Sequence, residues 1–135
     1  VVLVEHDMGV VMDLADRAVV LDFFATALSP GHDTDAVDRL LAAEFVDHAA
    51  SAGDDGPASV RAKLSGLWTA LPTGYYEVLD VVSDGTLVAV RSVLRGGSQP
   101  VEFADFYRVS DGRIAEHWHV VDAAALRAAL TPPST

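Results

Sequence analysis

The second half of the chain constrains the fold most, because strand-like runs alternate there with short glycine turns. β-Branched and aromatic residues are concentrated between residues 75 and 121, where Asp-Gly and Gly-Gly dipeptides interrupt them. Turns of this kind join neighbouring antiparallel strands, so the pattern predicts a meander of four strands. The predicted strands are YYEVLDVVS, TLVAVRSVLR, VEFADFYRVS and RIAEHWHVV.

The first half of the chain has the three- and four-residue apolar spacing of amphipathic helices. It predicts a helix over residues 8–28, a short one at about 35–43 and a third that opens at Pro57. The segment EFVDHAA predicts a short strand, and residues 122–130 predict a closing helix. The apolar stripe of the first helix comprises Val11, Leu14, Ala18, Leu21, Ala25 and Leu28.

Composition favours one compact domain over residues 1–135, since half of the residues are hydrophobic and only 21% are charged. Helices followed by a mainly antiparallel sheet predict the α+β class. The net charge of -11 disfavours nucleic acid and anionic membranes as partners. The chain has no cysteine, no apolar run near the roughly 18 residues of a membrane span and no signal-peptide pattern, so we expect a cytoplasmic protein.

Two histidines near the end of the chain, His117 and His119, share one face of the last predicted strand. In a plain two-residue hairpin before this strand, Asp105 would point away from His119. We favour a bulge at Gly112 instead, because it brings Asp105 beside His119. The same register places Phe103, Tyr107 and His117 on that face and an apolar patch of Phe106, Ile114, Trp118 and Val120 on the other.

Two stretches of the chain, DAVDRLLAAEFVDH and DFYRVSDGRIAEHWHVVD, resemble the SnoaL-like polyketide cyclases of the nuclear transport factor 2-like superfamily. The resemblance covers residues 18–130 and includes an aromatic residue three positions before a histidine, here Phe45 and His48. It implies a cone-shaped fold, with helices packed on a curved, mainly antiparallel sheet. It also implies an apolar pocket for a small hydrophobic molecule, and a homodimer formed through the outer sheet face.

His119 stands where these cyclases usually carry the aspartate that acts as general base. Imidazole also accepts protons near neutral pH, because its ordinary pKa is about 6.5. One interpretation makes His119 a catalytic base supported by Asp105. The other makes the two residues a buried hydrogen-bonded pair without catalytic function. The residues expected to line the pocket and bind substrate are His48, Trp68, Phe103, Tyr107 and His117.

The function that the resemblance implies is a cofactor-independent aldol-type cyclisation or isomerisation of a polyketide-like or carbonyl substrate. A non-catalytic module that binds a hydrophobic ligand or serves assembly is the alternative, because one fold can support both. Epoxide hydrolysis is a further alternative. His117 and His119 could both reach one metal ion, but the family pocket is metal-free, so no metal and no cofactor is expected.

The N-terminal stretch VVLVEHDMGVVMDLADRAVVLDF is similar to another family. It resembles the switch-histidine segment of the ATPase of branched-chain amino acid ABC transporters, in which the histidine matching His6 senses ATP. The chain lacks the phosphate-binding G-x-x-x-x-G-K-[ST] loop that this role requires, so we do not expect ATPase activity. We interpret residues 1–22 as a fused or artefactual segment that supplies the start of the first helix.

Overall fold

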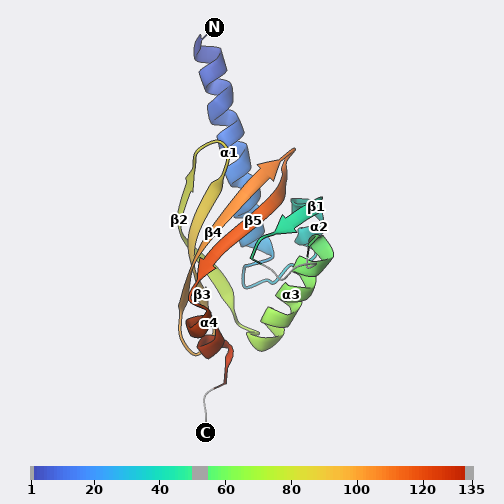
Figure 1. Cartoon of the computed structure of the whole chain (residues 1–135), viewed down its shortest axis with the longest axis vertical. Coiled ribbons are helices and arrows are strands. Elements are labelled where there is room, and N and C mark those ends of the chain that lie inside the picture. Colours follow the sequence, from blue (N-terminus) through green and yellow to red (C-terminus); the bar gives the residue numbers. More distant parts are fainter. Residues whose placement is uncertain (1, 50–54, 133–135) are drawn as a thin grey trace.

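The computed structural model describes residues 2–49 and 55–132, with side chains from Leu14 onward. Its elements form an α+β fold, as predicted, in which α1 passes behind the sheet and α3 lies beside β1 (Figure 1). The helices are α1 (Val2–Thr26), α2 (Ala36–Leu40), α3 (Pro57–Ala70) and α4 (Ala123–Leu130). The strands are β1 (Leu41–Asp47), β2 (Tyr75–Ser83), β3 (Val88–Arg95), β4 (Val101–Ser110) and β5 (Arg113–Val121).

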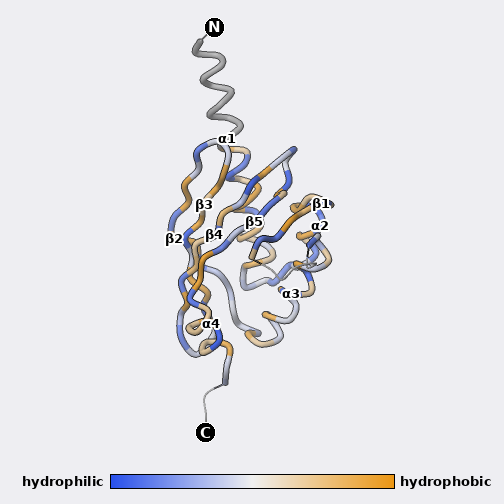
Figure 2. Tube along the Cα trace, viewed as in Figure 1, coloured by the Kyte–Doolittle hydropathy of each residue, from blue (hydrophilic) through white to orange (hydrophobic). Residues whose placement is uncertain are grey.

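One five-stranded sheet in the order β1-β5-β4-β3-β2 carries the fold. Strands β2 to β5 form the predicted antiparallel meander, and β1 pairs with β5 in parallel. Hydrophobic and hydrophilic stretches both occur along the strands (Figure 2). In β4, buried residues alternate with more exposed ones, because successive side chains point to opposite faces. None of the helices in the described part of the chain is long and apolar enough to span a membrane.

The apolar stripe predicted for the first helix is the wrong one. Leu14 is 55% exposed and Leu21 is 38% exposed, while Val11 lies outside the described side chains. The stripe that packs on the sheet includes Phe23 and Phe24, whose aromatic rings bury far more apolar area than alanines at the competing positions. It comprises Val20, Phe23, Phe24, Ala27 and Leu28, and Leu28 is the one residue that both stripes share.

The turn between β4 and β5 differs from the predicted bulged turn at Gly112, but the predicted pairing of Asp105 with His119 is present. Ser110 pairs directly with Arg113 across a plain two-residue turn. Its central residues have φ values of 52° at Asp111 and 75° at Gly112, as hairpin turns of this length require.

The extra residue is Ala115 in β5, two positions after the turn ends. Val109 pairs with Ile114, whereas Arg108 pairs with Glu116, so Ala115 has no partner on β4. This bulge reverses the face of the sheet to which each later side chain of β5 points. Asp105 consequently lies opposite His119, as expected. Ile114, which precedes the bulge, is 1% exposed and faces the core, so its predicted place in the outer patch is wrong.

Candidate functional site

A cavity of about 220 Å³ lies between the inner face of the sheet and helices α1, α3 and α4. Apolar side chains make most of its wall, including Phe23, Phe45, Leu64, Phe103 and Leu126. Such a cavity is small compared with common ligand pockets of roughly 300–1,000 Å³, and it suits a compact hydrophobic molecule. The polar residues in its lining are Asp47, Lys63, Tyr76, Asp105, Tyr107, His117 and His119.

Strand pairing places these polar groups in two neighbouring rows on the inner face. Asp47 of β1 pairs with His117 of β5, which pairs with Tyr107 of β4. In the next row, His119 pairs with Asp105 of β4. Because residues two apart on a strand share a face, both rows face the cavity.

His117 is held between two carboxylates. Its Nδ1 lies 2.9 Å from Oδ1 of Asp47, and its Nε2 lies 2.7 Å from Oδ1 of Asp105. Burial alone lowers the pKa of His117, but the hydrogen bonds to Asp105 and Asp47 outweigh it and raise the pKa to about 9. The ring is therefore an imidazolium at neutral pH, and both of its N–H groups donate to carboxylates.

Asp47 completes this group, and sequence reasoning did not identify it. Burial raises its pKa, but the bond from His117 and smaller contributions, including Lys63, leave the pKa below its ordinary value. The Nζ of Lys63 lies 3.8 Å from Oδ2 of Asp47. The only signal in the sequence was its position next to His48. The partner of Asp47 is determined by the parallel pairing of β1 with β5, which joins residues 70 positions apart in the chain.

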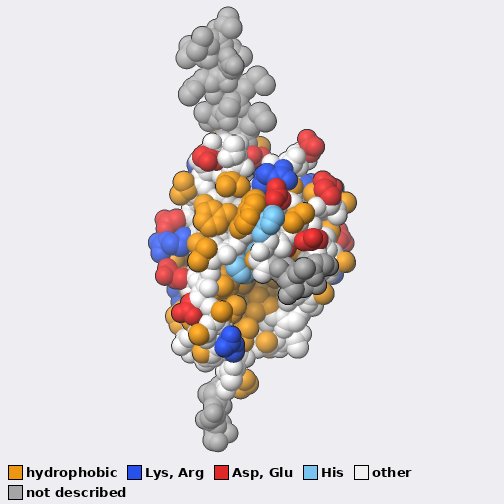
Figure 3. Space-filling view, viewed as in Figure 1, with side chains coloured by type: hydrophobic (Ala, Val, Ile, Leu, Met, Phe, Trp, Pro, Cys, Tyr) orange, Lys and Arg blue, Asp and Glu red, His pale blue; other side chains and the backbone are white. Residues whose placement is uncertain are grey.

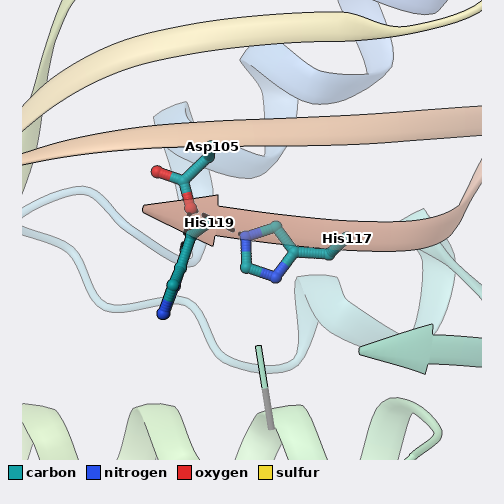
Figure 4. Close-up of side chains that lie close together, drawn as sticks. All are labelled: Asp105, His117 and His119. Carbon is teal, nitrogen blue, oxygen red and sulfur yellow. Dashed lines mark hydrogen bonds and ion pairs between the residues drawn. The ribbon is translucent and has the colours of Figure 1, made fainter. Parts of the chain in front are cut away.

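His119 remains outside this hydrogen-bonded group. Its Nδ1 is 4.0 Å from Oδ1 of Asp105, and the far end of its ring points away from that carboxylate (Figure 4). Burial lowers the pKa of His119, and repulsion by the charged His117 lowers it further. The side chain is 30% exposed and packs its ring against Phe103 at a centroid distance of 5.8 Å. His119 is therefore a neutral imidazole on the cavity wall, next to a carboxylate.

Three of the residues expected to bind substrate, Phe103, Tyr107 and His117, do line the cavity. Trp68 does not, because its indole N–H donates to the carbonyl of Ala27 at 3.1 Å and its ring stacks on His32 at 4.1 Å. These contacts make Trp68 a packing residue of the core, and it is absent from the residues that line the cavity.

His48 also lies away from the cavity, contrary to expectation. Asp47 before it faces the cavity, so His48 points to the opposite side of the sheet. There its ring stacks on Trp118 at 4.6 Å, and its Nε2 lies 2.7 Å from Oε2 of Glu116. His48 thus belongs to the outer face.

The outer face carries an apolar row across four strands. The row consists of Val82 in β2, Ala89 in β3, Phe106 in β4 and Trp118 in β5, and each residue pairs with the next one across the sheet. Val120 lies on the same side and is 67% exposed, and Val82 is 64% exposed. Figure 3 shows a face of the molecule on which hydrophobic side chains gather over the strands.

Asp105, His117 and His119 each offer one ligand atom, and these atoms lie within 4.8 Å of one another. A metal ion at this point would have to displace the proton of His117 and break its 2.7 Å bond to Asp105. The raised pKa of His117, about 9, opposes this displacement at neutral pH. The hydrogen-bonded arrangement thus accounts for the cluster without a metal.

Solved structures similar to this one share the cone-shaped nuclear transport factor 2-like fold, as predicted. A protein from Jannaschia sp. CCS1, provisionally named a SnoaL-like polyketide cyclase, has a TM-score of 0.78 and 19% identity, covering 91% of this chain and 96% of its own. One from Bacillus cereus ATCC 10987, provisionally named a polyketide cyclase, has a TM-score of 0.73 and 22% identity, covering 83% and 77%. TsrD from Streptomyces laurentii has a TM-score of 0.73 and 19% identity, covering 87% and 95%.

Sequence comparison gives the family directly. No curated protein matches the chain. The family model of the SnoaL-like polyketide cyclases matches residues 18–130, the range over which the sequence motifs predict the resemblance. The match covers most of the 135 residues, including every strand and the cavity lining. The chain belongs to the SnoaL-like polyketide cyclase family.

Proposed function

We propose that the protein moves a proton on a hydrophobic carbonyl compound bound in the cavity, in a cofactor-independent cyclisation or isomerisation of the aldol type. The observation that carries this proposal is the neutral, half-buried imidazole of His119 on the wall of an apolar cavity. Membership of the SnoaL-like polyketide cyclase family supports the same class of reaction.

In this reaction His119 is the general base and Asp105 supports it. A neutral imidazole next to an apolar ligand can remove a proton from the carbon beside a carbonyl group. The imidazolium that forms is stabilised by the carboxylate of Asp105, 4.0 Å from Nδ1. His117 cannot exchange protons readily, since both of its N–H groups are bound, and it acts instead by holding Asp105 in place.

The observed placement of the arginines gives no support to epoxide hydrolysis, which usually needs an arginine between two acids at the site. Arg91, Arg95 and Arg108 all form ion pairs with acidic residues outside the cavity lining. Among the described residues, the lining contains no arginine. The remaining alternative is a non-catalytic binding module, in which the cavity holds a ligand and His119 only packs against it.

An isotope-exchange experiment separates catalysis from simple binding. The aromatic ketone 2-acetylnaphthalene has exchangeable protons next to its carbonyl group, and their replacement in D₂O can be followed by NMR. We expect the wild-type protein to accelerate this exchange and His119→Gln to lose at least about 10²-fold of the acceleration. His48→Gln is the matched control, because it removes a histidine from the outer face. Equal rates for wild type and His119→Gln would exclude His119 as the base.

We further propose that two copies associate through the outer sheet face. The row from Val82 to Trp118, extended by the exposed Val120, is a contiguous apolar surface of the kind that monomers seldom expose. Covering this surface with a second copy would leave the cavity on the inner face free for its ligand.

A further inference from the structure

Two tyrosine hydroxyls on the cavity wall have no hydrogen-bond partner in the described part of the chain. Tyr107 of β4 and Tyr76 of β2 both line the cavity, and Tyr107 is only 3% exposed. A buried hydroxyl group normally has a partner, because leaving it unpaired costs roughly 1–3 kcal/mol. No described residue supplies this partner for either tyrosine, so a bound ligand can take its place.

The hydroxyl of Tyr107 opens into the cavity. Among the described residues, the side-chain atoms that are fully enclosed without a partner are Nε of Arg61 and Oγ of Ser92. The oxygen of Tyr107 is not one of them, so it borders open space, and the space beside this buried residue is the cavity. The hydroxyl is thus placed to meet a bound ligand.

Aromatic packing holds both phenol rings in fixed positions. The ring of Tyr107 stacks on His117 at a centroid distance of 4.9 Å and meets Phe24 edge-on at 6.1 Å. The ring of Tyr76 meets Phe103 edge-on at 5.2 Å, and Phe103 in turn packs against His119. The two donors are therefore preorganised, which is the property that makes a hydroxyl effective in stabilising developing charge.

Both hydroxyl groups stay protonated at neutral pH. Burial raises the pKa of Tyr107 and of Tyr76 well above the ordinary value, and the negative charge of Asp105 raises both further. The phenols therefore act as hydrogen-bond donors to a ligand and not as bases. The oxygen that they meet must be an acceptor, such as a carbonyl oxygen.

The base and the donor Tyr107 lie at a suitable spacing. Tyr107 pairs with His117, so His119 is its diagonal neighbour on the same face of the sheet. Diagonal neighbours of this kind are about 7–8 Å apart at their Cα atoms, within reach of two long side chains. A ligand placed between them can present its carbonyl oxygen to the phenol and the adjacent carbon to the imidazole.

We propose that Tyr107 and Tyr76 bind the carbonyl oxygen of the substrate, and that the site thereby selects ketones with an acidic hydrogen on the adjacent carbon. This inference rests on the proposed function. His119 takes the proton as the C–H bond breaks, and the electron pair forms a C=C bond while the carbonyl π electrons move onto oxygen. The resulting enolate oxygen accepts the two O–H hydrogen bonds. In a cyclisation, the enolate carbon then attacks a second carbonyl group, whose alkoxide takes the proton back from His119. In an isomerisation, His119 returns the proton to a different carbon.

Two measurements with different probes test the role of the tyrosines. The carbonyl stretching frequency of bound 2-acetylnaphthalene reports hydrogen bonds to its oxygen directly and requires no turnover. The relative affinities of this ketone and of 2-ethylnaphthalene, which lacks the oxygen, report the same bonds thermodynamically. We expect the wild-type protein to lower the carbonyl frequency and to prefer the ketone by about fivefold.

The variants Tyr107→Phe and Tyr76→Phe remove one hydroxyl each and keep the ring. We expect each to reverse part of the frequency shift, and loss of one donor to slow α-proton exchange by about 10²-fold. Tyr75→Phe is the matched control, since Tyr75 is adjacent in β2 and absent from the cavity lining. It should leave the frequency, the affinity ratio and the exchange rate unchanged.

The possible outcomes distinguish this inference from the proposed function. A carbonyl frequency that is the same in wild type, Tyr107→Phe and Tyr76→Phe overturns the inference, even if His119-dependent exchange persists. A tyrosine-dependent frequency shift without any exchange overturns the proposed function alone and leaves the tyrosines as ligand-binding groups. Failure of the wild-type protein to bind either compound overturns both.

Discussion

Asp105 lies directly opposite His119 across the β4–β5 ladder, yet its carboxylate is bonded to His117. The distance from Oδ1 of Asp105 is 2.7 Å to Nε2 of His117 and 4.0 Å to Nδ1 of His119. The diagonal bond is favoured because Asp47 binds the other side of His117 and fixes its charge. One histidine is consequently held charged, and the other stays neutral beside the cavity.

The neutral histidine should determine the pH dependence of activity. The pKa of His119 is lowered from 6.5, so the base is active above that pKa and becomes protonated below it. We expect α-proton exchange of 2-acetylnaphthalene to be constant near neutral pH and to fall as the pH drops through a value below 6.5. A rate profile whose acid limb lies at pH 7 or above would contradict this assignment.

The charged histidine should instead determine the pH dependence of stability. Its pKa in the folded protein, about 9, lies above the unfolded value near 6.5, so its contribution is fully present below pH 6.5 and lost as the pH rises through 9. The expected loss in free energy of unfolding is up to about 3 kcal/mol. Urea unfolding at pH 6.5 and 9.5 measures it, and His117→Gln should abolish most of the difference, whereas His48→Gln should retain it.

Two glycine substitutions test the turn between β4 and β5. Gly112 has a φ of 75°, so Gly112→Ala should destabilise the fold by about 1 kcal/mol although no atom lies within 4 Å of the added Cβ. Gly66 in α3 has equally open surroundings and helical backbone, so Gly66→Ala should stabilise it by roughly 0.5–1 kcal/mol. Thermal unfolding compares the two, and shifts of the same sign would argue against the observed turn.

The outer face offers a test of association. We expect a mass of two chains in light scattering at micromolar concentration, and a mass of one chain for Val120→Lys, which places charge in the apolar surface. Leu14→Lys in α1 replaces another exposed apolar residue and should remain dimeric. A wild-type protein that is monomeric under these conditions would refute the proposed dimer.

The histidine cluster should bind no metal when the protein is purified without chelator and without added metal. The proton on His117 and its two carboxylate partners occupy the atoms that an ion would need. Elemental analysis for zinc, iron and copper provides the measurement. A stoichiometric metal that is lost in His119→Gln would show that the cluster is a metal site after all.

Much of the fold could be predicted from local sequence signals. Period-two alternation and glycine turns identified the strands, and Pro57 marked the start of α3. The phase of α1 could not be decided this way, since two stripes share its helical spacing. Burial of Phe23 and Phe24 against the sheet made the choice, through the larger apolar area of their rings.

The sequence by itself determined the family and the class of fold. Tertiary structure decided which groups meet. The bulge at Ala115 turns Asp105 and His119 to one face, because one unpaired residue reverses the parity of a strand. The parallel pairing of β1 with β5 adds Asp47 to the site and turns His48 away. Such contacts join residues far apart in the chain, so only the assembled sheet determines them.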